Sequence, residues 1–295
     1  MLRIGTAGWS YPDWEGIVYP EGASTRREAL PMVAALFDTV EINVTFYRPP
    51  TARMSESWVR RVASRPRFRF TAKLWQGFTH QRDQRHLAEE KSFKEGIAPL
   101  GDAGRLGALL AQFPQSFRNT AQNQGYLEEL IARFSCFPLV IEVRHASWVN
   151  DSFLASLDER RVGFCNVDQP LIGDAAPPTS VMTGGIGYVR LHGRNRENWF
   201  RKDAGRDARY DYLYSREEIH EWAERIRLMQ GKVKGGGEIF IIANNHYRGQ
   251  GPANALELIH LMTGQPVTVP ETLAAAYPRL ASIALRSEKP GMLPL

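Results

Sequence analysis

An acid and a base stand two residues apart at the end of an aliphatic run in the segment PLVIEVRHASW, residues 138–148. Side chains two positions apart on a β-strand share a face, so Glu142 and Arg144 point the same way. Burying a charge without a partner costs on the order of several kcal/mol. The two charges therefore either face water or belong to a prepared site, where a carboxylate can transfer protons and a guanidinium can hold an anion.

Polar residues end other apolar runs in the same way, and they lie toward the C-terminal end of each run. They are Glu41, Asn43, Lys73, Gln112, Asn166, Asp168, Arg190, His192 and Asn244. If the runs are barrel strands, period-two phasing points these side chains inward. A half-solvated sheet would instead scatter polar residues along whole strands, so the pattern favours a pocket at one end.

These residue types predict acid–base chemistry on an anionic substrate. We expect Glu41, Glu142 and His192 to be catalytic, because carboxylates buried near one another titrate closer to neutrality. A second set is predicted to bind the substrate: Asn43, Tyr47, Lys73, His80, Gln112, Arg144, Asp168, Arg190, Arg194, Asn244 and Asn245. The cations among them suit phosphate or carboxylate, although each could equally neutralise an acid in a structural ion pair.

A metal site is an alternative, because the mouth also holds histidines and carboxylates of the types that bind zinc or manganese. No H-x-H or H-E-x-x-H spacing supports it, and the nearby arginines and lysine would repel a cation. We therefore predict no metal and no cofactor. Nucleophilic catalysis is disfavoured as well, because Cys165 is phased toward the helices and no serine lies in a G-x-S-x-G turn.

Eight apolar runs position these residues, and most of the gaps between them carry helical periodicity. The runs cover residues 3–8, 39–43, 68–73, 106–113, 138–144, 162–167, 187–193 and 238–244. Ser215 and Glu218 form a capping box before one predicted helix. Strands alternating with helices imply an α/β fold with parallel strands, and eight units predict a (β/α)8 barrel of the TIM type. An open doubly wound sheet is the alternative, but the first strand lacks the G-x-G-x-x-G turn.

The chain of 295 residues is predicted to be one barrel domain, residues 1–264, with a C-terminal extension, residues 265–295, packed on it. Its net charge is +5, and 30 of its 37 basic residues are arginine. We read the two cysteines, Cys136 and Cys165, as reduced core residues of a cytoplasmic protein. No apolar run is long enough to cross a membrane, so we expect no membrane partner.

Two loops flank the predicted mouth. The aromatic residues of GWSYPDW, Trp9, Tyr11 and Trp14, are more often packing residues than ligand-stacking ones. The segment 193–215 follows the seventh strand and interleaves arginines with aromatic residues, a combination that suits phosphates and stacked bases. We predict that this segment is a lid that recruits an anion and becomes more ordered when one binds, with a solvated structural loop as the alternative.

Read in order, several stretches resemble the bacterial and archaeal family of domain of unknown function 72. They include GTAGWSYPDWEGIVYP, VEINVTFYRPP, FRFTAKLWQGFTH, VIEVRHASW, YVRLHGRN and IANNHYRGQGPANALEL, and the resemblance covers residues 3–262. It implies a TIM-type barrel and no established activity. The characteristic residues of the family fall at Glu41, Asn43, Thr45, Phe46, Tyr47, Lys73, Thr79, His80, Gln112, Glu142, Arg144, Arg190, His192, Gly193 and Asn245. The loop QFPQSF lacks a second proline that is frequent in the family, and the tail beyond 265 lies outside the pattern.

Two classes of function follow from the residues. The first is an enzyme, with hydrolase- or lyase-type acid–base chemistry, that acts on a phosphate ester, a nucleotide-like molecule or nucleic acid. The second is a non-catalytic module that binds a small anionic metabolite in the same pocket. A metal-dependent phosphodiesterase or nuclease is a further alternative, and the sequence identifies no protein partner.

Overall fold

A closed barrel of eight parallel strands forms the centre of the protein, in a computed structural model that describes residues 1–22, 25–201, 207–233 and 235–285. The strands are β1 Leu2–Ala7, β2 Thr39–Ile42, β3 Arg69–Lys73, β4 Leu106–Gln112, β5 Leu139–Glu142, β6 Gly163–Asp168, β7 Ile186–Leu191 and β8 Glu238–Ala243. Each strand pairs with its neighbours in the chain, and β1 pairs with β8 to close the barrel. The predicted fold is confirmed.

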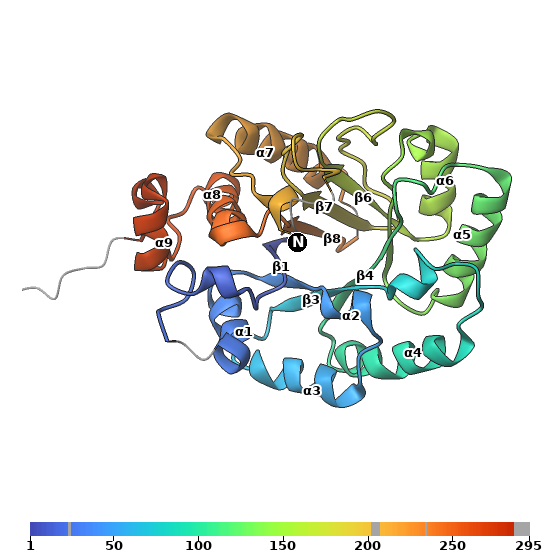
Figure 1. The fold of residues 1–295 in the computed structure, drawn as a ribbon, viewed down its shortest axis with the longest axis horizontal. Helices are drawn as coiled ribbons and strands as arrows, with labels where there is room; N and C mark the ends of the chain where they lie inside the picture. The colour runs from blue at the N-terminus through green and yellow to red at the C-terminus, as the bar shows by residue number, and fades with distance from the viewer. Residues whose placement is uncertain (23–24, 202–206, 234, 286–295) are drawn as a thin grey trace, which may run out of the picture.

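Helices surround this barrel, as Figure 1 shows. They are α1 Thr25–Leu36, α3 Ala52–Arg61, α4 Leu87–Asp102, α5 Ala121–Arg133, α6 Asp151–Glu159, α7 Arg216–Gln230 and α8 Gln250–Thr263. Ser215 and Glu218 make the capping box that was predicted for α7. A short helix, α2 Val44–Tyr47, follows β2 directly and brings its aromatic residues to the barrel mouth. In the part of the chain that the structure describes, every helix is too short or too polar to span a bilayer.

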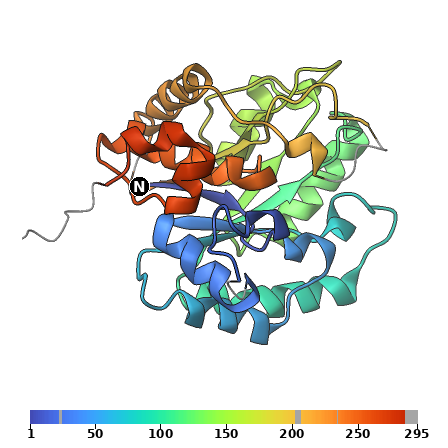
Figure 2. The same ribbon diagram turned by 60° about the vertical axis from the view of Figure 1, so that its left-hand side comes forward.

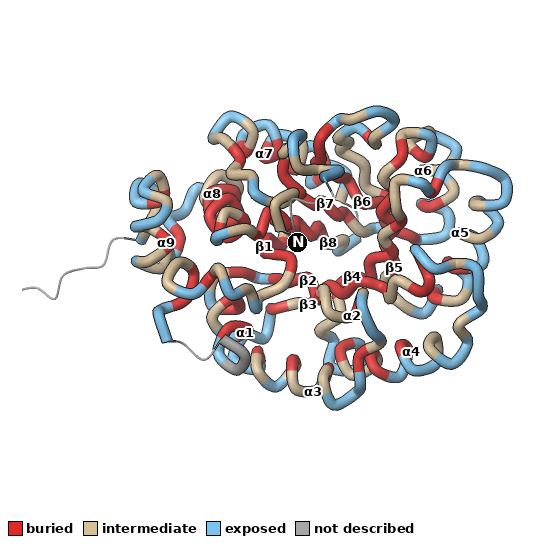
Figure 3. Tube along the Cα trace, in the orientation of Figure 1, coloured by how far each residue is buried: buried red, intermediate tan, exposed pale blue. Residues whose placement is uncertain are grey.

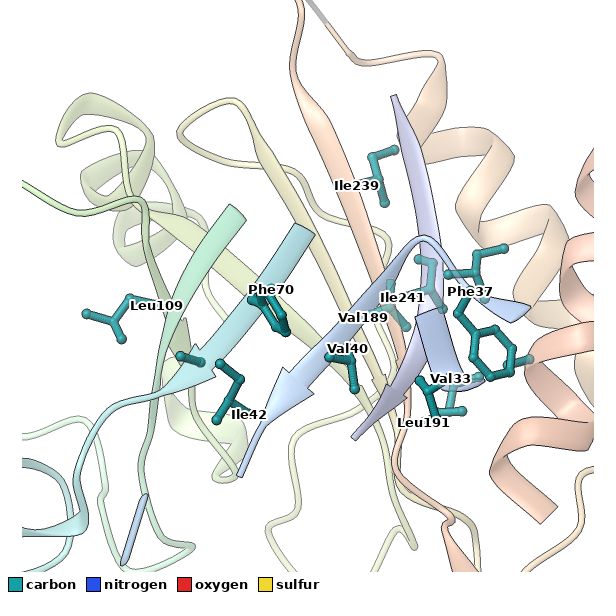
Figure 4. Close-up of a cluster of buried hydrophobic side chains, with 14 of the residues drawn as sticks. Val33, Phe37, Val40, Ile42, Phe70, Leu109, Val189, Leu191, Ile239 and Ile241 are labelled. Atoms are coloured by element: carbon teal, nitrogen blue, oxygen red, sulfur yellow. The ribbon is translucent and has the colours of Figure 1, made fainter. Parts of the chain in front are cut away.

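The apolar core has two layers, as period-two strands require. One face of each strand packs on the helices, and Val40 and Ile42 of β2 belong to the same buried cluster as Val33 of α1 and Phe37, which follows α1 (Figure 4). The opposite face fills the barrel interior with Ala7, Ala108, Leu110, Val140, Cys165, Val167, Tyr188, Phe240 and Ile242. The buried parts of the chain are accordingly concentrated around the strands, with exposed segments at the periphery (Figure 3).

The cysteine predictions need correction. Cys165 lies in the interior layer of the barrel and does not face the helices, because β6 has the opposite phase to the one predicted. Cys136 is exposed and is no core residue. It lies in the turn after α5, where Phe134 supplies the buried contact instead.

The described part of the C-terminal extension packs on the barrel beside α8 (Figure 2). It contains α9 Glu271–Ala276 and a 3-10 helix, Pro278–Ser282. Leu273 and Leu280 join the outer apolar layer, and Thr272 Oγ1 donates a hydrogen bond to the carbonyl oxygen of Ile17 at 2.7 Å. Residues 286–295 lie outside the described residues.

Candidate functional site

A cavity of about 590 Å³ opens at the C-terminal ends of the strands. Seven predicted site residues line it: Asn43, Tyr47, Lys73, His80, Gln112, Arg190 and Asn244. The cavity is within the range of roughly 300–1,000 Å³ that is usual for sites binding small molecules. Barrel enzymes carry their chemistry at this face, so the strand ends bring the polar residues together where the sequence predicted.

Arg190 forms the floor of this cavity, held by the carboxylates of two other strands. Its Nη2 donates to Glu41 Oε1 at 2.7 Å, and its Nη1 donates to Glu142 Oε2 at 2.7 Å. Both carboxylates are fully buried, so these bonds are charge-assisted and dry. The inward phase predicted for Glu142 and Arg190 therefore brings the two side chains together.

The remaining oxygen atoms of Glu41 and Glu142 accept hydrogen bonds from other side chains. The Tyr188 hydroxyl donates to Glu41 Oε2 at 2.9 Å, and Arg144 Nε donates to Glu142 Oε1. Burial alone would raise the pKa of Glu142, but Arg144 and Arg190 hold it well below its usual range. Burial opposes the charge of Arg190 too, yet Glu142 and Glu41 hold its pKa well above the ordinary value. The charges of the floor therefore balance one another, although the buried Nε of Arg190 has no hydrogen-bond partner among the described residues.

His192 lies behind this floor and is fully buried. Arg144 Nη2 is 2.9 Å from its Nε2, and Asn244 Nδ2 is 2.7 Å from its Nδ1. Burial, together with Arg144 and Arg190, holds the pKa of His192 well below its usual value, so the ring is neutral at pH 7. Among the described residues, no group of three or more His, Cys, Asp or Glu side chains is arranged to hold a metal ion.

Lys73 enters the cavity from the end of β3 and, unlike Arg190, has no carboxylate partner among the described residues. Its Nζ donates to Gln112 Oε1 at 2.7 Å and lies 4.0 Å from the centre of the Phe46 ring. No described carboxylate is within salt-bridge distance of it. Burial and the nearby Arg190 lower the pKa of Lys73 to about 7. Burial and Lys73 in turn lower the pKa of His80 to about 4.

Loops complete the walls with aromatic and basic residues. Trp9 and Tyr11 follow β1, where Gly8 has a φ of 78° and a Cβ on it would lie 2.7 Å from the Tyr11 hydroxyl. His246 stacks on Tyr11 with ring centres 4.3 Å apart. Trp9 and Tyr11 therefore line the cavity, whereas Trp14 of the same loop is fully buried and donates to the carbonyl oxygen of His246, as the packing interpretation expected.

The segment 193–215 reaches the cavity through Arg209 and Tyr210. Trp199 of the same segment lies over Arg144, with the guanidinium carbon 6.0 Å from the ring centre. Residues 202–206, part of the predicted lid, lie outside the described residues. Its ordering by a ligand remains a prediction.

Four predicted binding residues do not line the cavity, namely Arg144, Asp168, Arg194 and Asn245, and the inward phase assigned to β6 is wrong. Asp168 points toward α7, where it accepts hydrogen bonds from Trp222 Nε1 and Arg194 Nε, each at 3.0 Å. Arg194 also bonds Glu218 and Glu221. Burial raises the pKa of Asp168, although Arg194 opposes the shift.

Asn166 and Asn245 have structural partners as well. Asn166 Oδ1 accepts from the backbone N–H of Val181, and its Nδ2 donates to the carbonyl oxygen of Val181. Asn245 Nδ2 donates to the carbonyl oxygen of Tyr212 and is fully buried. Neither side chain lines the cavity.

Sequence reasoning missed several residues of the site. Tyr188 stands two positions before Arg190, so its inward phase was available from the pattern. Gln169, which accepts from Arg144 Nη1 at 2.8 Å, would have followed from the correct phase of β6. Arg209 and His246 also line the cavity. Arg209 lies in the arginine-rich segment that was predicted to flank the mouth, and His246 follows the end of the eighth strand, but the pattern did not single out either side chain.

The fold and the cavity together define a (β/α)8 barrel with a basic, aromatic-lined pocket at its C-terminal face. The family described as "Protein of unknown function DUF72" matches residues 3–278, and the chain belongs to this family.

Relatives of known sequence or structure agree with this assignment. UPF0759 protein YunF of Bacillus subtilis (strain 168) is 29% identical over an alignment of 280 positions, and the match covers 89% of this chain and 95% of that protein. The crystal structure of a DUF72 family protein from Thermotoga maritima MSB8 is 35% identical, with a TM-score of 0.78 over 89% of this chain and 99% of that one. One from Enterococcus faecalis V583 is 26% identical, with a TM-score of 0.77 over 89% and 95% of the two chains.

Proposed function

We propose that this protein is an enzyme that binds a small anionic substrate, of the phosphate-ester or nucleotide-like class, at the C-terminal mouth of the barrel. The charge of the cavity walls carries this proposal. The charged side chains among the described lining residues are cationic, and two of them, Lys73 and Arg209, have no carboxylate partner in the described chain. A cation without a partner in a partly buried wall favours an anion that completes it.

The aromatic walls indicate what else the substrate carries. Trp9, Tyr11, Phe46 and Tyr210 surround the same space. Aromatic faces favour stacking with flat or apolar groups. An anion attached to a ring, as in a nucleotide or a sugar phosphate, meets both requirements.

Titratable groups with shifted pKa values favour an enzyme over a non-catalytic binding module. None of the predicted catalytic residues Glu41, Glu142 and His192 lines the cavity. Glu41 and Glu142 bond Arg190, and His192 contacts Arg144 and Asn244, so we assign all three to holding the floor in place. Lys73 and His80 line the cavity, and their pKa values of about 7 and 4 leave proton-accepting forms at neutral pH. We assign proton transfer to these two residues.

A matched pair of variants on one loop tests the proposal. Arg209 lines the cavity, whereas Arg196 is exposed and outside it. Calorimetric titration with inorganic phosphate, ribose 5-phosphate and adenosine monophosphate should show about tenfold weaker binding in Arg209→Ala, because a charge-assisted hydrogen bond is lost. Its salt dependence should flatten, and Arg196→Ala should bind as the unmodified protein does.

Equal affinities in the two variants would contradict an anion site at this wall. Nuclear magnetic resonance of the ligands after incubation separates the two classes of function. A phosphate compound that is bound and recovered unchanged would favour the binding module, whereas conversion that is lost in Lys73→Met would favour the enzyme.

A further inference from the structure

Lys73 differs from every other lysine that the structure describes, because it is buried inside the cavity and has no acid to neutralise it. Its exposed fraction is 9%. Lys91 and Lys94, in contrast, lie on α4 and pair with Glu95 and Glu90 at 3.9 and 2.6 Å. A structural lysine either reaches water or pairs with a carboxylate. Lys73 does neither, so its position needs another explanation.

The groups around Lys73 explain why it remains without an acid. Glu41 of β2 and Glu142 of β5 are the nearby carboxylates, and both are already bound by Arg190 and its neighbours. The two acids and the two guanidinium groups of Arg144 and Arg190 balance one another. Lys73 therefore adds a positive charge to a neutral network, next to cations on β7 and after β5 and a neutral His80.

The arrangement keeps the amine of Lys73 reactive at neutral pH. Gln112 Oε1 and the Phe46 ring are its contacts, and both accept either protonation state of the amine. With a pKa of about 7, roughly half of the amine is free at pH 7, against about one part in 2,500 for an ordinary lysine. Lysines desolvated beside other cations are the ones that enzymes use as nucleophiles toward carbonyl groups.

We propose that Lys73 forms an imine with the carbonyl group of an anionic aldehyde or ketone, which narrows the substrate class of the function proposed above and rests on it. The free amine of Lys73 adds to the carbonyl carbon and forms a carbinolamine. The carbinolamine hydroxyl then takes a proton from solvent and leaves as water while the nitrogen lone pair forms the C=N bond. The product is a protonated imine, whose positive charge replaces that of the lysine and draws electrons from the adjacent carbon, as lyase chemistry requires.

Reductive trapping with a matched pair of aldehydes tests this inference on the unmodified protein. The probes are 4-formylbenzoate and benzaldehyde, which differ by one carboxylate, and sodium cyanoborohydride reduces any imine to a stable amine. Peptide mass spectrometry then compares labelling of Lys73 with that of Lys91, whose side chain is 79% exposed, as the internal control for intrinsic reactivity. We expect Lys73 to be labelled at least tenfold faster than Lys91 at pH 7.5, with a rate that levels off above about pH 7. The rate for Lys91 should still rise.

The aldehyde pair and Arg209→Ala separate this inference from the proposed function. Faster labelling of Lys73 by 4-formylbenzoate, reduced in Arg209→Ala, supports both. Equally fast labelling of Lys73 by the two aldehydes supports the imine and overturns the anionic substrate class. Labelling of Lys73 no faster than Lys91 overturns the imine, and phosphate binding that still depends on Arg209 would then leave the proposed function standing.

Discussion

The floor and the wall of the cavity both contain basic residues, but those of the floor are paired with carboxylates and, among the described residues, Lys73 and Arg209 of the wall are not. At the floor, Arg190 is held by two buried carboxylates, and Arg144 balances the second charge. At the wall, Lys73 and Arg209 have no carboxylate partner in the described chain. Because the charges of the floor neutralise one another and those of Lys73 and Arg209 are not neutralised by a described carboxylate, the floor gives the cavity its shape and the wall offers cations to a ligand. The difference shows that charge type alone does not identify a binding residue at a barrel mouth.

The largest effect is expected from a substitution that removes one carboxylate of the floor. Glu142→Gln leaves Arg144 and Arg190 short of one buried negative charge, and removing one member of a buried pair costs about 3–5 kcal/mol. Urea unfolding at pH 7 measures the free energy of unfolding. Glu129→Gln, at an exposed position of α5, is the control and should change it by less than about 0.5 kcal/mol. Similar small losses in both variants would mean that the floor is no structural network.

A smaller effect of opposite sign is expected at the wall. Lys73→Met removes an unpaired buried cation, so the free energy of unfolding at pH 7 should rise by about 1–3 kcal/mol. The folded pKa of about 7 lies below the unfolded value near 10.4, so the unfolded state binds more protons between these values. Stability of the unmodified protein should therefore increase from pH 7 to 10.

Lys73→Met should lose most of this slope, because methionine does not titrate. The control is Lys91→Met, which removes an exposed lysine and should keep both the stability and the slope. A Lys73→Met protein that is less stable at pH 7 and keeps its slope would contradict the contrast between wall and floor.

The smallest effect concerns His192, behind the floor, and the loss of stability below pH 7. The folded pKa of His192 lies well below the unfolded value near 6.5, so the unfolded state binds more protons in between. Stability is therefore lost as pH falls from 7 to 5.5, by about 1 kcal/mol for this residue. Urea unfolding at the two pH values should show a shallower loss in His192→Asn than in the control His220→Asn, at an exposed position of α7. Equal losses would show that folding leaves the pKa of His192 unshifted.

Much of the fold and of the floor could be predicted from the sequence, because both depend on strand periodicity. The alternation of residues along β5 and β7 is enough to aim Glu142 and Arg190 at the barrel axis, and the structure joins them. Period two is a geometric property of every strand, so this inference needs no knowledge of the neighbours.

The same rule gave the wrong phase for β6, because the alternation of residues does not show which hydrogen-bond partners each face of the strand meets. Asn166 and Asp168 were aimed inward because they are polar. On the helix side, however, Asn166 satisfies the backbone of Val181, and Asp168 is bonded by Trp222 and Arg194. A buried polar residue is tolerated on either face once its hydrogen bonds are made. Those partners are distant in sequence, so the pattern did not reveal them.

The cavity walls were the least predictable part of the site. Trp9, Tyr11, Arg209 and His246 all come from loops, whose paths depend on tertiary packing and not on a repeating pattern. The local excess of arginine in 193–215 indicated an anion site in general. It did not distinguish Arg209, which lines the cavity, from Arg194, which bonds Asp168.

The closure of the barrel by β1 and β8 has a consequence for the growing chain. Leu2 to Thr6 pair with Ile239 to Ala243, so the first strand of the barrel gains its second neighbour only when the eighth has been made. Until then one edge of β1 lacks its hydrogen-bond partner, and such an edge is a template for pairing with other chains. Contacts this distant in sequence also form slowly. This edge of β1 therefore stays open to such pairing throughout the synthesis of the residues between the two strands.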